Sequence, residues 1–237
     1  MVRARRTPAE ALVQQGRALH DWLLALDDDG VAATPTVLPG WDVHALVAHL
    51  DLGLQRTTGG LGPDPGRPEG AARRALEHAR RFDLATLVDR FGEAVDRLDG
   101  APLPSDVVGP EAVELVVHAD DLTRSLPEHE PAPQERPAVG VACRSLAELL
   151  ETRYPGRSVE VRVPPHAAVQ CSVLRGGQLD PGPTHTRGTP PNVVETDPTT
   201  FLRLMTGRTT WADALASGRV AASGLRADLS EMVPLLG

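Results

Sequence analysis

The feature that most constrains the fold is a proline-rich segment near the middle of the chain. Three prolines occur within the seven residues 127–133, and proline lacks a backbone N–H and disfavours helix in the residue before it. Such a composition is typical of a stiff, extended linker. We therefore expect two domains, covering residues 1–130 and 136–237, each long enough to bury a core.

Before this linker, apolar residues recur with the spacing of helices that bury one face. A capping box at Thr7–Glu10, with proline at the first helical position, predicts the start of the first helix, and Asp42 is expected to cap the second. Residues 71–82 and 84–98 are expected to form one broken helix or two consecutive ones, and a last helix is expected over 110–126. With little β-type alternation, this half is predicted to be a four-helix bundle.

Beyond the linker the pattern changes to mixed helix and strand. A helix around 139–152 precedes strict alternation at 158–163, which is typical of a strand with one buried face. The remaining expected elements are strands at 167–173 and 219–225, helices that begin near 197 and 210, and a terminal helix. The second half is therefore predicted to be a smaller α+β domain.

Composition excludes several classes of function. The net charge of -8 argues against nucleic acid as a partner, because phosphate binding needs a concentrated basic surface. All 24 basic residues are arginine, which excludes lysine Schiff-base chemistry and a Walker-type phosphate loop. Cys143 and Cys171 are too few for a disulfide framework and are expected to be buried thiols. No signal sequence and no membrane-spanning run are expected, which predicts a cytoplasmic protein.

Two helical segments carry residue types that zinc uses as ligands. Glu114 and His118 are four residues apart, so a helix places both on one face. Their helix is otherwise apolar and is expected to be buried, so the two polar groups need partners, and a metal ion would supply charge balance and coordination. His49 borders the apolar face of the second helix between the small residues Ala45 and Gly53, which leave room for a metal. Two imidazoles and one carboxylate are typical of open, catalytic zinc sites.

Other interpretations of these residues remain open. A glutamate and a histidine at this spacing usually form only an electrostatic contact on the helix surface. A histidine at an apolar border is more often a hydrogen-bonded core residue than a metal ligand. His44 falls with Asp51 and Gln55 on the polar side of the second helix, which makes it a poorer ligand than His49.

The motifs GWDVHALVAHL at 40–50 and ELVVHADDL at 114–122 resemble the DinB-like, mycothiol-dependent maleylpyruvate isomerase family. The resemblance implies a DinB-like bundle in which a divalent metal, usually zinc, binds the residues here numbered His49, Glu114 and His118. The family's H-x-x-D-L pattern also matches this sequence. Asp121 is thus a candidate for orienting a metal ligand, with a solvated or capping carboxylate as the alternative.

The second half resembles the sterol-carrier-like α+β domain often attached to this family, at residues 159–170, 185–192 and 206–224. The resemblance implies an apolar cavity and an arginine recruited to the metal cleft. Three arginines are candidates for this catalytic role, each with a surface or structural role as its alternative: Arg187, Arg208 and Arg219.

The resemblance further implies that mycothiol, a low-molecular-weight thiol, occupies the open metal position through its sulfur. It indicates an isomerase or an S-transferase for a small electrophile, in which an arginine holds a substrate carboxylate and Asp121, water or the cofactor handles protons. Two alternatives remain: a non-catalytic sterol-carrier-like protein for an apolar ligand, and a metal-dependent hydrolase. The substrate, the remaining cofactor-binding residues and the oligomeric state do not follow from the sequence.

Overall fold

The computed structural model describes residues 6–26, 30–59, 68–180, 182 and 191–236. The chain divides into two compact units, Met1–Val139 and Gly140–Gly237. The division lies inside helix α6 (Arg136–Arg153), which follows the proline-rich segment. No helix in the described part of the chain is long and apolar enough to cross a membrane.

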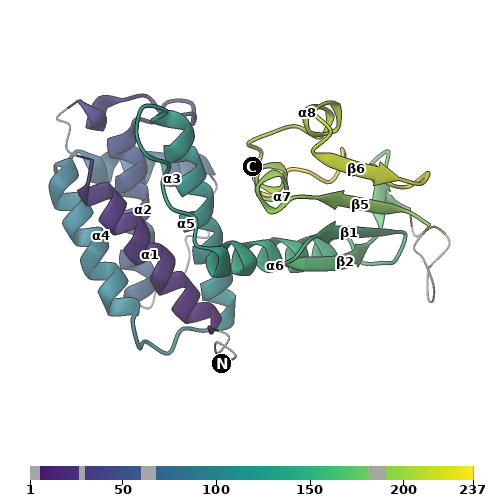
Figure 1. Cartoon of the computed structure of the whole chain (residues 1–237), viewed down its shortest axis with the longest axis horizontal. Helices are drawn as coiled ribbons and strands as arrows, with labels where there is room; N and C mark the ends of the chain where they lie inside the picture. Colours follow the sequence, from purple (N-terminus) through teal and green to yellow (C-terminus); the bar gives the residue numbers. More distant parts are fainter. Residues whose placement is uncertain (1–5, 27–29, 60–67, 181, 183–190, 237) are drawn as a thin grey trace. The chain divides into compact units, whose positions relative to one another are not determined.

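The first unit is an all-helical bundle (Figure 1). Its four main helices are packed so that α2 contacts both α4 and α5, and α1 contacts the same two helices. The predicted bundle is therefore confirmed. The elements are α1 (Pro8–Leu24), η1 (Val31–Ala33), α2 (Val43–Thr58), α3 (Pro68–Ala79), α4 (Leu84–Leu98) and α5 (Ser105–Ser125).

Side-chain caps fix where the helices of the bundle begin. The backbone N–H of Glu10 donates to Thr7 Oγ1 at 3.2 Å, and that of Thr7 donates to Glu10 Oε2 at 2.7 Å, which is the predicted capping box. The backbone N–H of Ala45 donates to Asp42 Oδ1 at 2.7 Å. Each cap satisfies a backbone donor that the helix leaves unpaired. The Asp42 cap thereby sets the start of α2, from which His49 follows two turns later.

The polar side of α2 is buried within the bundle. Asp51, predicted on a polar side with His44 and Gln55, has no exposed surface. Its carboxylate accepts hydrogen bonds from His78 Nε2 at 2.6 Å, Gln55 Nε2 at 3.0 Å and Arg90 Nε at 3.1 Å. This side of α2 is polar, as expected, and it is buried because α3 and α4 pack over it.

The second unit is α+β, as predicted (Figure 1). Its four-stranded sheet has the order β2–β1–β5–β6, in which β1 and β5 run parallel and the outer pairs run antiparallel. A separate antiparallel pair is formed by β3 and β4. The elements are β1 (Val159–Val163), β2 (Ala167–Cys171), β3 (Val173–Arg175), β4 (Gln178–Asp180), β5 (Val193–Thr196), α7 (Pro198–Met205), α8 (Trp211–Ala216) and β6 (Val220–Ser223).

The alternation that predicted β1 is confirmed, since its three valines are buried and the residues between them are not. The terminal helix was a wrong prediction, because the described residues after β6 form turns and no helix. There the backbone N–H groups of Leu235 and Leu236 donate to Met205 O at 2.8 and 2.9 Å, and Met232 is buried. The apolar spacing near the C-terminus thus reflects packing against the end of α7.

Candidate metal centre

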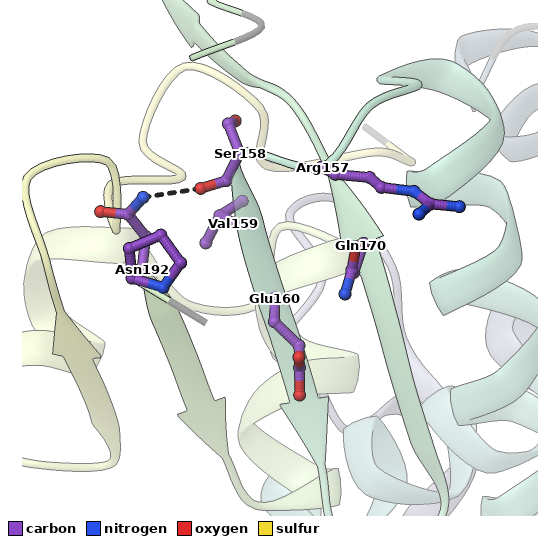
Figure 2. A pocket seen from close by; sticks show the side chains of 7 residues that line it. Arg157, Ser158, Val159, Glu160, Gln170 and Asn192 are labelled. Atoms are coloured by element: carbon purple, nitrogen blue, oxygen red, sulfur yellow. Dashed lines mark hydrogen bonds between the residues drawn. The ribbon is translucent and has the colours of Figure 1, made fainter. Parts of the chain in front are cut away.

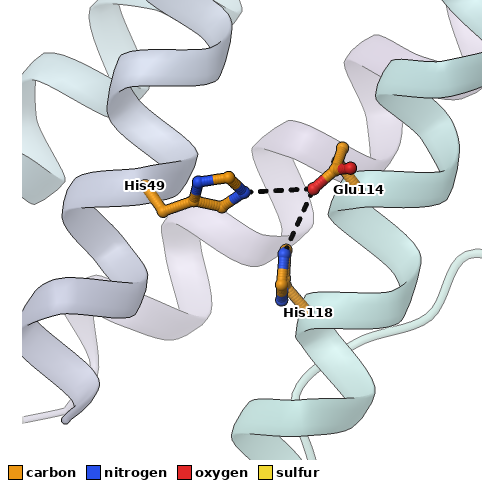
Figure 3. Close-up of side chains that lie close together, drawn as sticks. All are labelled: His49, Glu114 and His118. Atoms are coloured by element: carbon orange, nitrogen blue, oxygen red, sulfur yellow. Dashed lines mark hydrogen bonds and ion pairs between the residues drawn. The ribbon is translucent and has the colours of Figure 1, made fainter. Parts of the chain in front are cut away.

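Helices α2 and α5 bring the three predicted ligands to one point (Figure 3). His49 Nε2 and His118 Nε2 each lie 3.1 Å from the same oxygen, Glu114 Oε2. One ligand atom from each residue lies within 4.8 Å of the other two. The two imidazole rings are 5.0 Å apart between centroids and meet at 81°. Two nitrogens and one oxygen therefore surround a single small space, which is the donor set of an open zinc site.

The cluster has a buried side and an accessible side. The side chain of His118 is 7% exposed, whereas those of His49 and Glu114 are 22% and 46% exposed. An ion held by these three residues would be reachable from the accessible side, as in catalytic metal sites and unlike closed structural ones.

The residues of the cluster shift one another's pKa values. Burial raises the pKa of Glu114, but the hydrogen bonds from His118 and His49 outweigh it and hold that pKa well below its usual range. Burial lowers the pKa of His118, but its hydrogen bonds to Asp121 and Glu114 outweigh that effect and raise it. The glutamate is therefore an anion across the working pH range, ready to ligate a metal.

Asp121 supports His118 from the side opposite Glu114. His118 Nδ1 lies 3.0 Å from Asp121 Oδ2, and Asp121 has no exposed surface, which excludes the solvated role. A carboxylate that accepts from one imidazole nitrogen fixes the ring and leaves the other nitrogen free to bind metal. Here that other nitrogen is the Nε2 that points at Glu114.

Trp41 flanks the cluster and was not singled out in the sequence. Its ring meets that of His49 edge-on, with centroids 5.3 Å apart at 80°. The segment before α2 is held in place because Thr36 N donates to Trp41 O at 2.8 Å and Val37 N donates to Ser125 Oγ at 3.0 Å. The available signal was the position of this tryptophan directly before the cap Asp42.

Glu111, one turn before Glu114 on α5, is a second group that sequence reasoning missed. It is only 4% exposed, and Thr57 Oγ1 donates to its Oε1 at 2.6 Å. Burial raises the pKa of Glu111 to about 7, against a lowering by the Thr57 hydrogen bond. The spacing of residues 111, 114 and 118 along one helix face was the signal that could have identified it.

Because its pKa is raised on folding, Glu111 should make stability depend on pH. An unfolded glutamate has a pKa of about 4.3, so the protonated carboxyl stabilises the fold below that pH, and this contribution is lost as pH rises through the folded value. We expect Glu111→Gln to be more stable than the wild type at pH 8, by up to about 3 kcal/mol, and about equally stable at pH 4. Urea unfolding of the metal-free protein at both pH values measures this, with the exposed Glu128→Gln as control. A difference that is equal at both pH values would contradict the prediction.

The three candidate arginines belong to the second half of the chain. Arg187 lies outside the described residues. Arg208 Nη1 donates to Thr206 O at 2.8 Å, and the backbone oxygen of Arg219 accepts from Thr196 Oγ1 at 2.9 Å. The Arg208 side chain thus has a local contact in the second unit, whereas the contact of Arg219 involves its backbone alone, and a catalytic role for any of the three stays a prediction.

A shallow depression with no room for an enclosed water molecule lies at the start of β1 in the second unit (Figure 2). Asn192 Nδ2 donates to Ser158 O at 2.7 Å, and Asn192 Oδ1 accepts from Arg226 N at 3.0 Å. The amide of Asn192 is therefore used to hold β1 beside the segment that leads into β5. This depression is too small to be the apolar cavity that the resemblance implies, which stays a prediction.

Each half of the chain matches a model of a known protein family. Residues 12–123 match the family model of the mycothiol maleylpyruvate isomerase N-terminal domain, and residues 135–235 match that of the bacterial SCP ortholog. A crystal structure of a mycothiol-dependent maleylpyruvate isomerase is similar at 17% identity and a TM-score of 0.53, covering 92% of this chain and 93% of that one. A histidine-to-alanine mutant of such an enzyme is similar at 17% identity and a TM-score of 0.52, with the same coverage. No curated protein matches the chain. At this identity the likeness shows a shared fold.

Proposed function

The first unit belongs to the family of mycothiol maleylpyruvate isomerase N-terminal domains, and on this premise we propose that the protein is a mycothiol-dependent metalloenzyme. It acts on a small electrophilic substrate as an isomerase or a thiol S-transferase. The observation that carries the proposal is the convergence of His49, Glu114 and His118 on one space with an accessible side.

The proposed metal is zinc, held by these three residues. Magnesium and calcium prefer sites made of oxygen ligands alone, whereas two imidazoles and a carboxylate suit zinc. When bound, zinc would favour the thiolate form of a thiol near neutral pH. The protein's part is to keep Glu114 ionised, to fix the ring of His118 through Asp121, and to leave the exposed side of the cluster open for the thiol.

Asp121→Asn is expected to weaken zinc binding without removing any ligand. The amide keeps the size of the carboxylate but loses its charge, so it holds the His118 imidazole less firmly and makes it a poorer donor. Loss of such an outer partner typically costs about 10–100-fold in metal affinity. Competition with a chromogenic chelator measures the affinity, and Asp106→Asn in the exposed first turn of α5 is the control. Equal affinities for wild type and Asp121→Asn would contradict the orienting role.

The proposed function is tested by turnover of the zinc-loaded protein with maleylpyruvate, and with a panel of electrophiles scored for S-conjugates. We expect turnover or conjugation that requires both zinc and mycothiol and is lost in His118→Ala. Turnover that persists without thiol would favour a metal-dependent hydrolase. Metal-free protein that extracts lipid would favour the carrier. Either result would overturn the proposal.

A further inference from the structure

Glu111 is a buried carboxyl group that the proposed metal site does not use. Its Oε1 is occupied by the hydrogen bond from Thr57 Oγ1 at 2.6 Å. Among the residues that the structure describes, none donates a hydrogen bond to its second oxygen, Oε2. Burying a carboxyl group is unfavourable unless its oxygens are paired. Oε2 is not among the fully enclosed polar atoms that lack a partner, so this oxygen can be reached from outside and is free to pair with a ligand.

The unpaired oxygen faces open space beside Gly53 of α2. A β-carbon built on Gly53 would lie 4.0 Å from Glu111 Oε2 and would meet no other atom within that distance. Gly53 lies one turn after His49, and Glu111 lies one turn before Glu114. The open space therefore adjoins the metal cluster, between the same two helices.

Packing does not explain why residue 53 is glycine. Two other helical glycines of the bundle have close neighbours: a β-carbon on Gly16 would lie 2.8 Å from Val95, and one on Gly92 would lie 2.4 Å from the ring of His20. Gly53 has no such neighbour, although glycine is unfavourable inside a helix. A side chain is therefore missing at a position where the bundle has room for one.

We propose that Gly53 and Glu111 form the recognition side of the thiol site. In this arrangement the sulfur lies at the metal cluster, and a hydroxyl or amide N–H elsewhere in the thiol donates to Glu111 Oε2 across the space that Gly53 leaves. The proposal rests on the proposed function, because it takes a thiol at the cluster as given. It predicts selectivity for a thiol with polar groups beyond its cysteine portion, over a truncated one.

The test measures dissociation constants of the full-length, zinc-loaded protein by calorimetry, with mycothiol and with N-acetylcysteine as the truncated thiol. Loss of one hydrogen bond to a buried carboxyl group weakens binding by about tenfold. We expect Glu111→Gln to weaken mycothiol binding by about that factor while N-acetylcysteine binding changes less than about twofold. Gly53→Leu, which fills the space, should weaken mycothiol binding at least as much, and Gly53→Ala should weaken it less.

Measuring zinc content and a matched control variant distinguishes failure of this inference from failure of the proposed function. Ala85→Leu adds the same side chain at an exposed position of α4 and should leave zinc and thiol binding unchanged. Wild-type protein that binds no zinc, or binds zinc but neither thiol, would refute the proposed function. Wild type that binds both, with mycothiol affinity unchanged in Glu111→Gln and Gly53→Leu, would overturn this inference alone. Loss of zinc in either variant would also overturn it, since the residue would then act through the metal cluster.

Discussion

Replacement of His118 by alanine is expected to abolish stoichiometric zinc binding while the bundle stays folded. His118 supplies the buried side of the cluster, with its Nε2 3.1 Å from Glu114 Oε2. Removing a ligand should cost more than the roughly 10–100-fold in affinity that loss of an outer partner costs. Metal analysis of purified protein should fall from about one zinc per chain to a small fraction of that, and thiol-dependent turnover should fall with it.

His44→Ala is the matched control for this prediction. His44 lies on α2 as His49 does, but its Nε2 lies 2.9 Å from Phe82 O, on another side of the helix from the cluster. The control variant should keep its zinc. Full zinc occupancy in His118→Ala, with circular dichroism like that of wild type, would contradict the assignment of the ligands.

Asp51→Ala is expected to have the largest effect on stability. Its buried carboxylate accepts from His78, Arg90 and Gln55, so its removal leaves three polar groups without their partner inside the bundle. Breaking a buried ionic contact in this way lowers the free energy of unfolding by about 3–4 kcal/mol. This is the lower part of the usual range, because Arg90 partly reaches solvent. The free energy of unfolding should fall by this amount.

Urea unfolding followed by tryptophan emission measures the effect of Asp51→Ala in a Trp211→Phe background. The two remaining tryptophans, Trp22 and Trp41, both belong to the first unit, so the transition reports the bundle. Asp89→Ala, at an exposed position of α4, should change stability by less than about 0.5 kcal/mol. A loss below about 1 kcal/mol in Asp51→Ala would show that the buried network contributes little.

The metal cluster and the Asp51 network lie on different sides of helix α2. His49 and Gly53 face α5 and the proposed chemistry, whereas Asp51 is bonded to His78 of α3 and Arg90 of α4. The second set fixes α2 within the bundle, and the first set depends on that placement. We therefore interpret the Asp51 network as the support that keeps His49 aligned with Glu114.

Local rules were enough to predict much of the bundle and the candidate ligands. The capping box at Thr7, the cap at Asp42 and the four-residue spacing of Glu114 and His118 are properties of single helices, and the structure shows each of them. The alternation in β1 likewise depends only on one strand and its buried face. That the three clustered residues bind a metal stays a proposal, as do the domain ranges 1–130 and 136–237.

What the sequence did not reveal depends on contacts between elements. Asp51 reads as solvent-facing on an isolated helix, and only the packing of α3 and α4 buries it. In the sequence nothing distinguishes Glu111 from the other acidic residues. Its special position follows from its contacts with Thr57 and Gly53 of the neighbouring helix α2. The apolar residues of the C-terminal tail suggested a helix because helical spacing does not reveal whether they pack instead against the end of α7.

The central claim, that a thiol binds to a metal held by His49, Glu114 and His118, is tested most directly with cobalt in place of zinc. The visible spectrum of the cobalt-loaded protein should change on titration with mycothiol, gaining a sulfur-to-metal charge-transfer band that saturates at about one thiol per metal. The band should be missing from His118→Ala. A cobalt spectrum that stays the same through saturating mycothiol would contradict the account.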